Sequence, residues 1–270
     1  MGRLELEALS EILVERKGPT ALITLQRPDS LNALTVEMSR ELRGAVEGAA
    51  GLSGVHAIVI TGAGRAFSAG GDITFMQEVM SKGGRFEDFR ALVDSGREIA
   101  LALQAIDKPV IAAVNGAAAG GGMSLALACD VRWASENAKF GQSFVRIGLH
   151  PDWGALHALP RMIGTSRALE AMWTGDLIEA SEAHRLGIVS RVLPADMLMR
   201  ETLAFAERLA RGPAVAIGEI KRSVRRSLGY TLEQALAREI EAQETCWNTS
   251  DAREGFAAFL AKREPRFEGR

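Results

Sequence analysis

The chain has 270 residues, of which 47% are apolar and 24% charged, and its formal net charge is −2. This composition is typical of a folded protein with a large core, and the near-neutral charge supplies no basic field for nucleic acid or an anionic membrane. The two cysteines, Cys129 and Cys246, form no CxxC pair, which excludes a disulfide scaffold and a zinc ribbon. Residues 1–5 carry charges and no apolar run, so we expect no secretory signal and a cytoplasmic location.

The first elements expected along the chain are a hairpin and a helix. Residues 11–15 and 21–25 read as two strands joined by the turn Lys17-Gly18-Pro19. Thr35 is a suitable N-cap for the following helix. Its predicted apolar side consists of Val36, Leu42 and Val46.

Two strands that each lead into a Gly-rich loop come next. The apolar run 55–61 predicts a buried strand, and the loop 62–72 follows it. A helix then leads to Pro109, and the strand 110–114 leads into a second Gly-rich loop, 115–122. The predicted buried side of that helix consists of Phe86, Phe89, Val93, Ile99 and Leu103. The uncharged stretch from Pro109 to Cys129 has the length of a membrane span, but its proline and glycines favour a strand, a turn and the buried helix 123–128.

The second half of the chain is predicted to be mainly helical. Helices are expected at 152–163, 166–173 and 181–186, followed by a last strand over 188–193. The alternation of strand, Gly-rich turn and helix indicates an α/β protein with parallel pairing. We therefore divide the chain into a core, residues 1–194, and a C-terminal helical region, residues 195–270, whose apolar stripes would pack on the core or on another subunit.

The two Gly-rich loops do not match the common phosphate-binding motifs. Gly62-Ala63-Gly64 is followed by Phe67 where GxGxxG needs glycine, and no GxxxxGK[ST] or GxSxG occurs. Loops 68–72 and 120–122 instead carry backbone without side chains, which lets a ligand carbonyl approach the main-chain N–H groups closely. Two such donors on one oxygen would form an oxyanion hole, strengthened by the helix start after the second loop. The alternative is that both loops are tight packing turns.

Several ordered motifs resemble the enoyl-CoA hydratase/isomerase (crotonase) superfamily, from about residue 11 to residue 265. They are Arg27-Pro28, Asn32-Ala33-Leu34, Phe67-Ser68-Ala69-Gly70-Gly71-Asp72-Ile73, Lys108 to Gly116, Gly120-Gly121-Gly122, Cys129-Asp130, Phe140-Gly141-Gln142, Leu159-Pro160-Arg161 and Thr174-Gly175. The resemblance implies a spiral of ββα units with a C-terminal helical subdomain, assembled as a homotrimer or as a hexamer of two trimers. It also implies an acyl-CoA thioester as substrate, with coenzyme A as part of the substrate and no further cofactor.

The resemblance assigns residues to the site by their positions in these motifs. The backbone N–H groups of Gly71 and Gly121 would hold the thioester oxygen. The expected substrate-binding residues are Leu31, Ala69, Asp72, Ile73, Gly120, Ser124 and Phe144.

The residues at the acid/base positions are unusual for this resemblance. Hydratases of the superfamily use two glutamates, and this chain has Ser124 and Phe144 at those positions, so the two-glutamate mechanism is in doubt. Asp152 matches the catalytic carboxylate of some superfamily isomerases, and one carboxylate suffices for a 1,3-proton shift. The plainer reading of Asp152 is a helix N-cap after Pro151.

We therefore expect an enoyl-CoA isomerase with Asp152 as acid and base. The alternatives are a hydratase using other residues, a thioesterase using Ser124 with His150 and Asp152, and a non-catalytic acyl-CoA binding protein. No HExxH motif or carboxylate cluster occurs, so no metal is expected. The basic run Lys221-Arg222 with Arg225-Arg226 reads as a solvated helix face or as a site for CoA phosphates.

Overall fold

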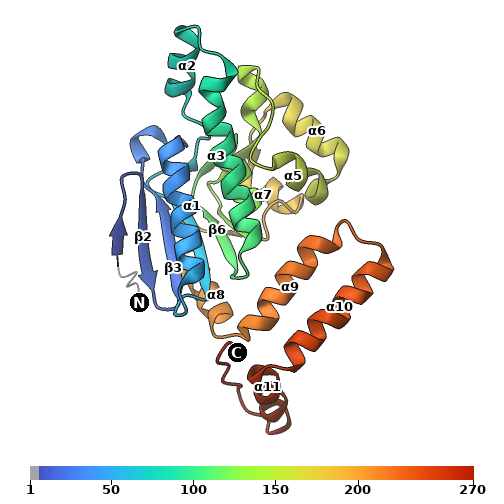
Figure 1. The fold of residues 1–270 in the computed structure, drawn as a ribbon. Helices are drawn as coiled ribbons and strands as arrows, with labels where there is room; N and C mark the ends of the chain where they lie inside the picture. Colours follow the sequence, from blue (N-terminus) through green and yellow to red (C-terminus); the bar gives the residue numbers. More distant parts are fainter. Residues whose placement is uncertain (1–5) are drawn as a thin grey trace.

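The main sheet runs through the centre of the molecule (Figure 1). The computed structural model describes residues 6–270, so the expectation for residues 1–5 lies outside it. Over the described residues the main sheet has seven strands, antiparallel from β1 to β3 and parallel from β3 onward. In sheet order they are β1 (Leu6–Ala8), β2 (Ile12–Lys17), β3 (Thr20–Leu25), β4 (Ala57–Gly62), β6 (Val110–Val114), β8 (Val131–Ser135) and β11 (Arg191–Leu193).

A second, smaller sheet was not expected from the sequence. Within residues 6–270 it contains β10 (Ile178–Glu179), β9 (Lys139–Gly141), β7 (Ala117–Ala119) and β5 (Ala66–Ser68), in that order. Strands β5 and β7 lie inside the two Gly-rich loops, where three-residue strands give too little pattern to be recognised. Each of β4, β6 and β8 is thus followed by a short strand of the second sheet and then by helix, which confirms the expected spiral of ββα units.

The larger core lies between one face of the main sheet and two long helices, α1 (Val36–Gly51) and α3 (Phe86–Ala105). Thr35 caps α1 as predicted, because its side chain accepts the N–H of Met38 at 2.9 Å. The predicted buried sides are partly wrong, since Val36 is 38% exposed and Phe86 is 59% exposed. The buried stripe of α3 consists instead of Leu92, Gly96, Ile99 and Leu103.

The remaining helices of the core lie between the strands of the spiral. Helix α2, with its Asp72 cap, was not expected, because no element was predicted between the loop 62–72 and the helix that contains Phe86. Helix α4 begins two residues earlier than predicted, at the second Gly-rich loop. The bounds are α2 (Ile73–Ser81), α4 (Gly121–Ala128), α5 (Ala155–Ile163), α6 (Thr165–Thr174) and α7 (Ala180–Arg185), with short 3₁₀ turns at Pro28–Ser30 and Ser143–Ile147.

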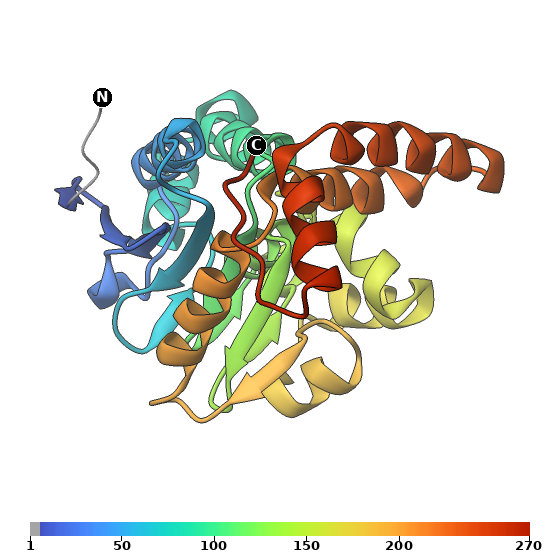
Figure 2. The ribbon, with the colours of Figure 1, turned by 90° about the horizontal axis from the view of Figure 1, so that it is seen from below.

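The C-terminal helices divide into one that belongs to the core and three that extend from it (Figures 1 and 2). Helix α8 (Leu198–Ala210) covers the second face of the main sheet, where Phe205 stacks on Trp133 with ring centroids 4.8 Å apart. Helices α9 (Ala214–Ser227), α10 (Leu232–Trp247) and α11 (Ser250–Leu260) follow, with α9 and α10 running side by side. The helical region therefore begins inside the core, and its division from the core at residue 194 stays a prediction.

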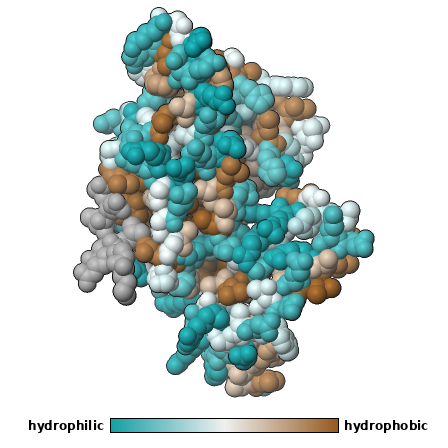
Figure 3. Space-filling view, in the orientation of Figure 1, coloured by the Kyte–Doolittle hydropathy of each residue, from teal (hydrophilic) through white to brown (hydrophobic). Residues whose placement is uncertain are grey.

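The extended helices leave many apolar side chains exposed, and on the face that Figure 3 shows these are scattered brown residues among mostly hydrophilic ones. Residues predicted to form their apolar stripes are strongly exposed, including Ile220, Val224, Leu232, Leu236, Ile240, Phe256 and Leu260. The basic run on α9 is mainly used inside the chain. Lys221 and Arg225 both pair with Asp130, at 2.8 and 2.6 Å, and so attach α9 to the main sheet. Among residues 6–270, no helix has the length and apolarity needed to cross a bilayer.

Candidate active site

The first Gly-rich loop is held in place by backbone pairing with residues 31–34. The N–H of Ala69 donates to Leu31 O at 2.9 Å, that of Leu34 to Gly70 O at 2.7 Å, and that of Asp72 to Leu34 O at 3.0 Å. These bonds use the groups on either side of Gly71. The Gly71 N–H itself has no hydrogen-bond acceptor among residues 6–270.

The second Gly-rich loop places another donor beside the first. Gly120 has φ +50° and donates its N–H to Gly141 O at 2.8 Å, and Gly121 is the first residue of α4. The first N–H groups of a helix have no intrahelical partner and lie at the positive end of its dipole. A Cβ built on Gly121 would lie 3.8 Å from Gly71 N, and one built on Gly70 would lie 3.1 Å from Gly121 N. The two donors therefore lie on adjoining backbone segments, as expected for an oxyanion hole.

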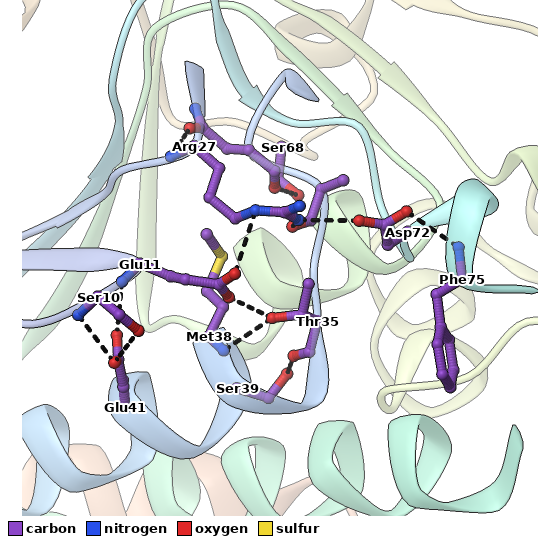
Figure 4. A network of polar contacts seen from close by, with 12 residues as sticks. Ser10, Glu11, Arg27, Thr35, Met38, Ser39, Glu41, Ser68, Asp72 and Phe75 are labelled. Carbon is purple, nitrogen blue, oxygen red and sulfur yellow. Dashed lines mark hydrogen bonds and ion pairs between the residues drawn. The ribbon is translucent and has the colours of Figure 1, made fainter. Parts of the chain in front are cut away.

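A polar network fixes the end of the first loop (Figure 4). Arg27 donates to Asp72 at 3.0 Å and lies 3.2 Å from the Glu11 carboxylate, while Asp72 caps α2 by accepting the N–H groups of Thr74 and Phe75. Burial alone would raise the pKa of Asp72, but the bonds from Arg27 and the two N–H groups together lower it. Asp72 thus holds the loop and the start of α2, and its expected contact with the substrate stays a prediction.

We predict that Asp72→Ala lowers the free energy of unfolding by about 1–3 kcal/mol, because it removes a helix cap and an ion pair. Asp72→Asn is the matched control, since asparagine also caps helices but carries no charge. Because the folded state lowers the pKa of Asp72, its charge stabilises the protein above the unfolded pKa of about 3.9. This contribution is lost as the pH falls through the folded pKa, so the wild type and Asp72→Asn should converge at acidic pH in urea titrations.

A small cavity of about 20 Å³ adjoins the two donors, enough for roughly one water molecule. Among the residues that the structure describes, Asp152 is the only ionisable one that lines it. The Met76 methyl group lies so close to where a Cβ on Gly71 would stand that the two would overlap, so this side chain packs directly against the backbone at the first donor. The lining residues are Gly71, Met76, Phe89, Leu92, Gly121, Phe144, Leu149, Asp152 and Trp153.

Asp152 is not a helix cap, so that reading of the sequence is wrong. Helix α5 begins at Ala155, with Gly154 at the cap position, and the Asp152 side chain makes no cap bond. Its Oδ1 atom is buried, with no hydrogen-bond partner within residues 6–270. Burial raises the pKa of Asp152 to about 6, opposed by its own N–H and by the charge of His150. A carboxyl group with this pKa can both accept and return a proton near neutral pH.

The other side chains considered for catalysis do not meet at this cavity. Ser124 is buried and its hydroxyl donates back to Gly120 O at 3.1 Å, while His150 is exposed. A Ser124–His150–Asp152 set is therefore not formed by any hydrogen bond of residues 6–270. Phe144 lines the cavity as a buried aromatic wall. In the same part of the chain, no group of three or more His, Cys, Asp and Glu residues could hold a metal ion.

A larger apolar groove continues from this cavity between α2 and α3, at the top of Figure 1. Its volume is about 520 Å³, and it shares Met76, Phe89 and Leu149 with the cavity at the donors. Volumes of about 300–1,000 Å³ suit ligands with several carbon atoms. The predicted substrate-binding residue Ile73 lies in its wall and is 53% exposed.

Comparison with known proteins decides the family. The sequence profile described as enoyl-CoA hydratase/isomerase matches residues 15–270. The chain belongs to the enoyl-CoA hydratase/isomerase family. A probable enoyl-CoA hydratase of Rhizobium meliloti is 41% identical over 96% of this chain and 98% of that protein. A crotonyl-CoA hydratase of Syntrophomonas wolfei is 36% identical, over 96% and 98%.

Solved structures of the enoyl-CoA hydratase/isomerase family share the fold. An enoyl-CoA hydratase structure from Geobacillus kaustophilus superimposes with a TM-score of 0.89 at 41% identity, covering 96% of this chain and 98% of that one. Another, from Bacillus anthracis, gives a TM-score of 0.91 at 33% identity, covering 97% and 100%. These matches confirm the expected superfamily and fold, and with them an enzyme of acyl-CoA chemistry.

Two residues of this family member's site were not expected from the sequence. Met76 lies one turn after the Asp72 cap, and the spacing of Ile73, Met76 and Met80 is the helical signal that could have revealed α2 and its inner face. Gly96 was not considered, because a single glycine inside a predicted helix carries no local signal of what packs on it.

Proposed function

We propose that this protein is an enoyl-CoA isomerase that moves a double bond by a 1,3-proton shift. The observation that carries the proposal is Asp152, the one carboxyl group among residues 6–270 that lines this otherwise apolar cavity, beside two N–H groups that have no acceptor in the same part of the chain. Hydration needs one group to deprotonate water and one to protonate carbon, whereas a proton shift needs one group that does both in turn. Ser124 and Phe144, at the positions of the hydratase glutamates, supply neither.

The proposed reaction uses the site as follows. The thioester oxygen accepts the N–H groups of Gly71 and Gly121, and the Asp152 carboxylate removes a proton from the α-carbon of a 3-enoyl thioester. The electron pair of the broken C–H bond moves into the conjugated dienolate, whose negative oxygen the two donors stabilise. Asp152 then returns the proton to the γ-carbon, which leaves the double bond between the α- and β-carbons.

The substrate follows from the cavities. The apolar groove between α2 and α3 begins at the wall of the reacting cavity, so it is suited to the distal part of an apolar acyl group. Because Met76 separates the two spaces, its flexible side chain would have to turn aside for such a group. We also retain Leu31, Ala69, Asp72, Ile73, Gly120, Ser124 and Phe144 as the proposed binding residues.

A hydratase is the second candidate, because the relatives above are named enoyl-CoA hydratase and crotonyl-CoA hydratase. In that case Asp152 would act on water, and a second group would have to come from elsewhere. Thioester hydrolysis and binding without turnover remain alternatives that the same experiment separates.

The test is mass spectrometry of 3-hexenoyl-CoA and 3-decenoyl-CoA incubated with the enzyme in D₂O, with 2-hexenoyl-CoA in a parallel sample. We expect migration of the double bond with deuterium incorporation and no water adduct. A water adduct as the main product would establish a hydratase instead, and free CoA would indicate a thioesterase. Unchanged substrates that nevertheless bind in a calorimetric titration would indicate a binding protein.

We further propose a homo-oligomer, a trimer or a hexamer of two trimers, assembled through α9–α11 in the cytoplasm. The support is the set of apolar side chains on these helices that a single chain leaves exposed. Light scattering after gel filtration should give a mass of three or six chains. Ile240→Glu, a 70%-exposed position on α10, should shift that mass toward one chain, whereas Thr245→Glu, at an exposed position on another side of α10, serves as control.

A further inference from the structure

Trp153, the residue after the proposed acid/base, has an unusual backbone conformation. Its φ is +53°, a left-handed conformation that bulky side chains rarely adopt, and its side chain is only 6% exposed. Such strain persists only where the surrounding structure enforces it, and it is concentrated at functional sites. The question is therefore what holds Trp153 in this conformation.

The indole ring lies against α3 at Gly96. A Cβ built on Gly96 would overlap Nε1, Cδ1 and Cε2 of the ring, so the missing side chain forms a notch that the indole fills. One turn further along α3, Ala100 Cβ lies 3.9 Å from where a Cβ on Gly154 would stand. The segment 153–154 therefore rests on α3 at two successive turns, and only glycine fits at the first of them.

This contact bears on Asp152 because little else fixes its carboxyl group. The Asp152 carbonyl accepts the N–H of Ala155 at 3.1 Å, but Oδ1 has no partner among residues 6–270. Trp153 lines the same cavity as Asp152 and closes one side of it. The other walls come from α2, α3 and the 3₁₀ turn before Gly148, through the apolar residues Met76, Phe89, Leu92 and Phe144. His150 lies on the same loop, and its positive form would lower the pKa of Asp152 against the effect of burial.

We propose that Trp153 is a positioning residue for Asp152: its indole, seated in the Gly96 notch of α3, fixes the carboxyl group beside the two N–H donors and keeps water from it. The expected effect on kcat rests on the proposed isomerase function, whereas the dependence of the Asp152 carboxyl group on Trp153 and Gly96 does not. Gly96 is then required by the site even though it lies on a helix and touches no substrate. A side chain at residue 96 would push the indole, and with it Asp152, away from the donors.

The experiment is a double-mutant cycle with Gly96→Ala, Trp153→Leu and the combined variant. One readout is the pKa of Asp152, followed through the ¹³C NMR signal of its carboxyl carbon in protein labelled at aspartate. The signal is assigned by its absence in Asp152→Asn. The other readout is the pair of kcat and KM values for a 3-enoyl-CoA, each measured separately. Gly44→Ala, at an exposed position on α1 with no atom within 4 Å of the added Cβ, is the control substitution.

Each single variant is expected to move the pKa of Asp152 from about 6 toward the ordinary value of about 3.9. Each should also lower kcat by about 10²-fold with KM little changed, the size associated with a misplaced group. Adding Gly96→Ala to Trp153→Leu should cost little more, because the ring that it displaces is gone, and Trp153→Phe should retain part of both properties. If Gly96→Ala does not fold, the pKa of Asp152 and kcat in Trp153→Leu still test the positioning role, and a combined variant that folds assigns the failure to the clash with the indole.

The proposal would be overturned if Trp153→Leu left the pKa of Asp152 and kcat at their wild-type values. Equal effects of Gly96→Ala with and without the indole would overturn it as well. The two proposals can fail separately. If the wild type does not isomerise 3-enoyl-CoA but the pKa of Asp152 shifts in the variants as expected, the proposed function is refuted and the positioning role of Trp153 is supported.

Discussion

Asp152→Asn is expected to lower kcat for double-bond migration by about 10²–10⁴-fold, the range that a positioned acid/base contributes. Asparagine keeps the shape of the side chain but accepts no proton, and no other ionisable residue between 6 and 270 lines the cavity. Because the two N–H donors remain, binding of the CoA ester should change little. Deuterium exchange at the α-carbon should fall with the rate, since the proposed mechanism uses one group for both proton transfers.

The same substitution should make the protein more stable above neutral pH. Burial raises the folded pKa of Asp152 to about 6, against about 3.9 in the unfolded chain, so ionisation favours unfolding. The contribution of Asp152 to wild-type stability is therefore greatest below the unfolded pKa and decreases as the pH rises through about 6. The advantage of Asp152→Asn should grow over this window to about 1–3 kcal/mol, the upper limit being two pKa units at 1.36 kcal/mol each.

Urea titrations between pH 4 and 8 measure the difference in the free energy of unfolding between the wild type and Asp152→Asn. Rates on 3-hexenoyl-CoA measure the loss of kcat. Asp196→Asn, at an exposed position after β11, is the control for removal of a carboxylate as such. A variant that keeps more than a tenth of the wild-type rate would remove Asp152 from the mechanism. A stability difference that does not vary with pH would show that its carboxyl group titrates normally.

The sequence predicted the main sheet better than the second sheet, for a physical reason. Strands β3, β4 and β6 are buried apolar runs of five or six residues, which is a strong signal. Strands β5, β7 and β9 have three residues each, and their glycines and alanines equally suit a loop. Their pairing comes from contacts between distant parts of the chain, which local pattern does not contain.

In the candidate active site, the positions of residues in the sequence motifs predicted the backbone N–H donors better than they predicted the roles of side chains. The missing side chains pointed to the loops 68–72 and 120–122, the resemblance assigned the donors to Gly71 and Gly121, and the structure places these two backbone segments side by side. Asp152 had two readings because aspartate after proline suits both a cap and an acid, and only the start of α5 at Ala155 separates them. Trp153 resting on Gly96 joins residues 57 positions apart and leaves no local trace.

Gly71→Ala should lower kcat/KM by about 10²–10³-fold, the cost of losing one oxyanion-hole donor. The added Cβ would meet the end of the Met76 side chain and lie 3.4 Å from Leu92 Cδ2, and both residues line the reacting cavity. The methyl group therefore points into a space of about 20 Å³ and keeps the thioester oxygen from the N–H of residue 71. The fold should tolerate the change, because the end of a methionine side chain moves easily.

Gly122→Ala provides the contrast, because its Cβ would overlap the backbone oxygen of Ser68, which cannot move aside. We expect that variant to lose stability, whereas Gly71→Ala should unfold within a few degrees of the wild type in calorimetry. The combined Gly71→Ala/Met76→Ala variant separates the two causes of lost activity. If it regains the wild-type rate, displacement of Met76 explains the loss, and obstruction of the Gly71 donor by the added methyl group is refuted.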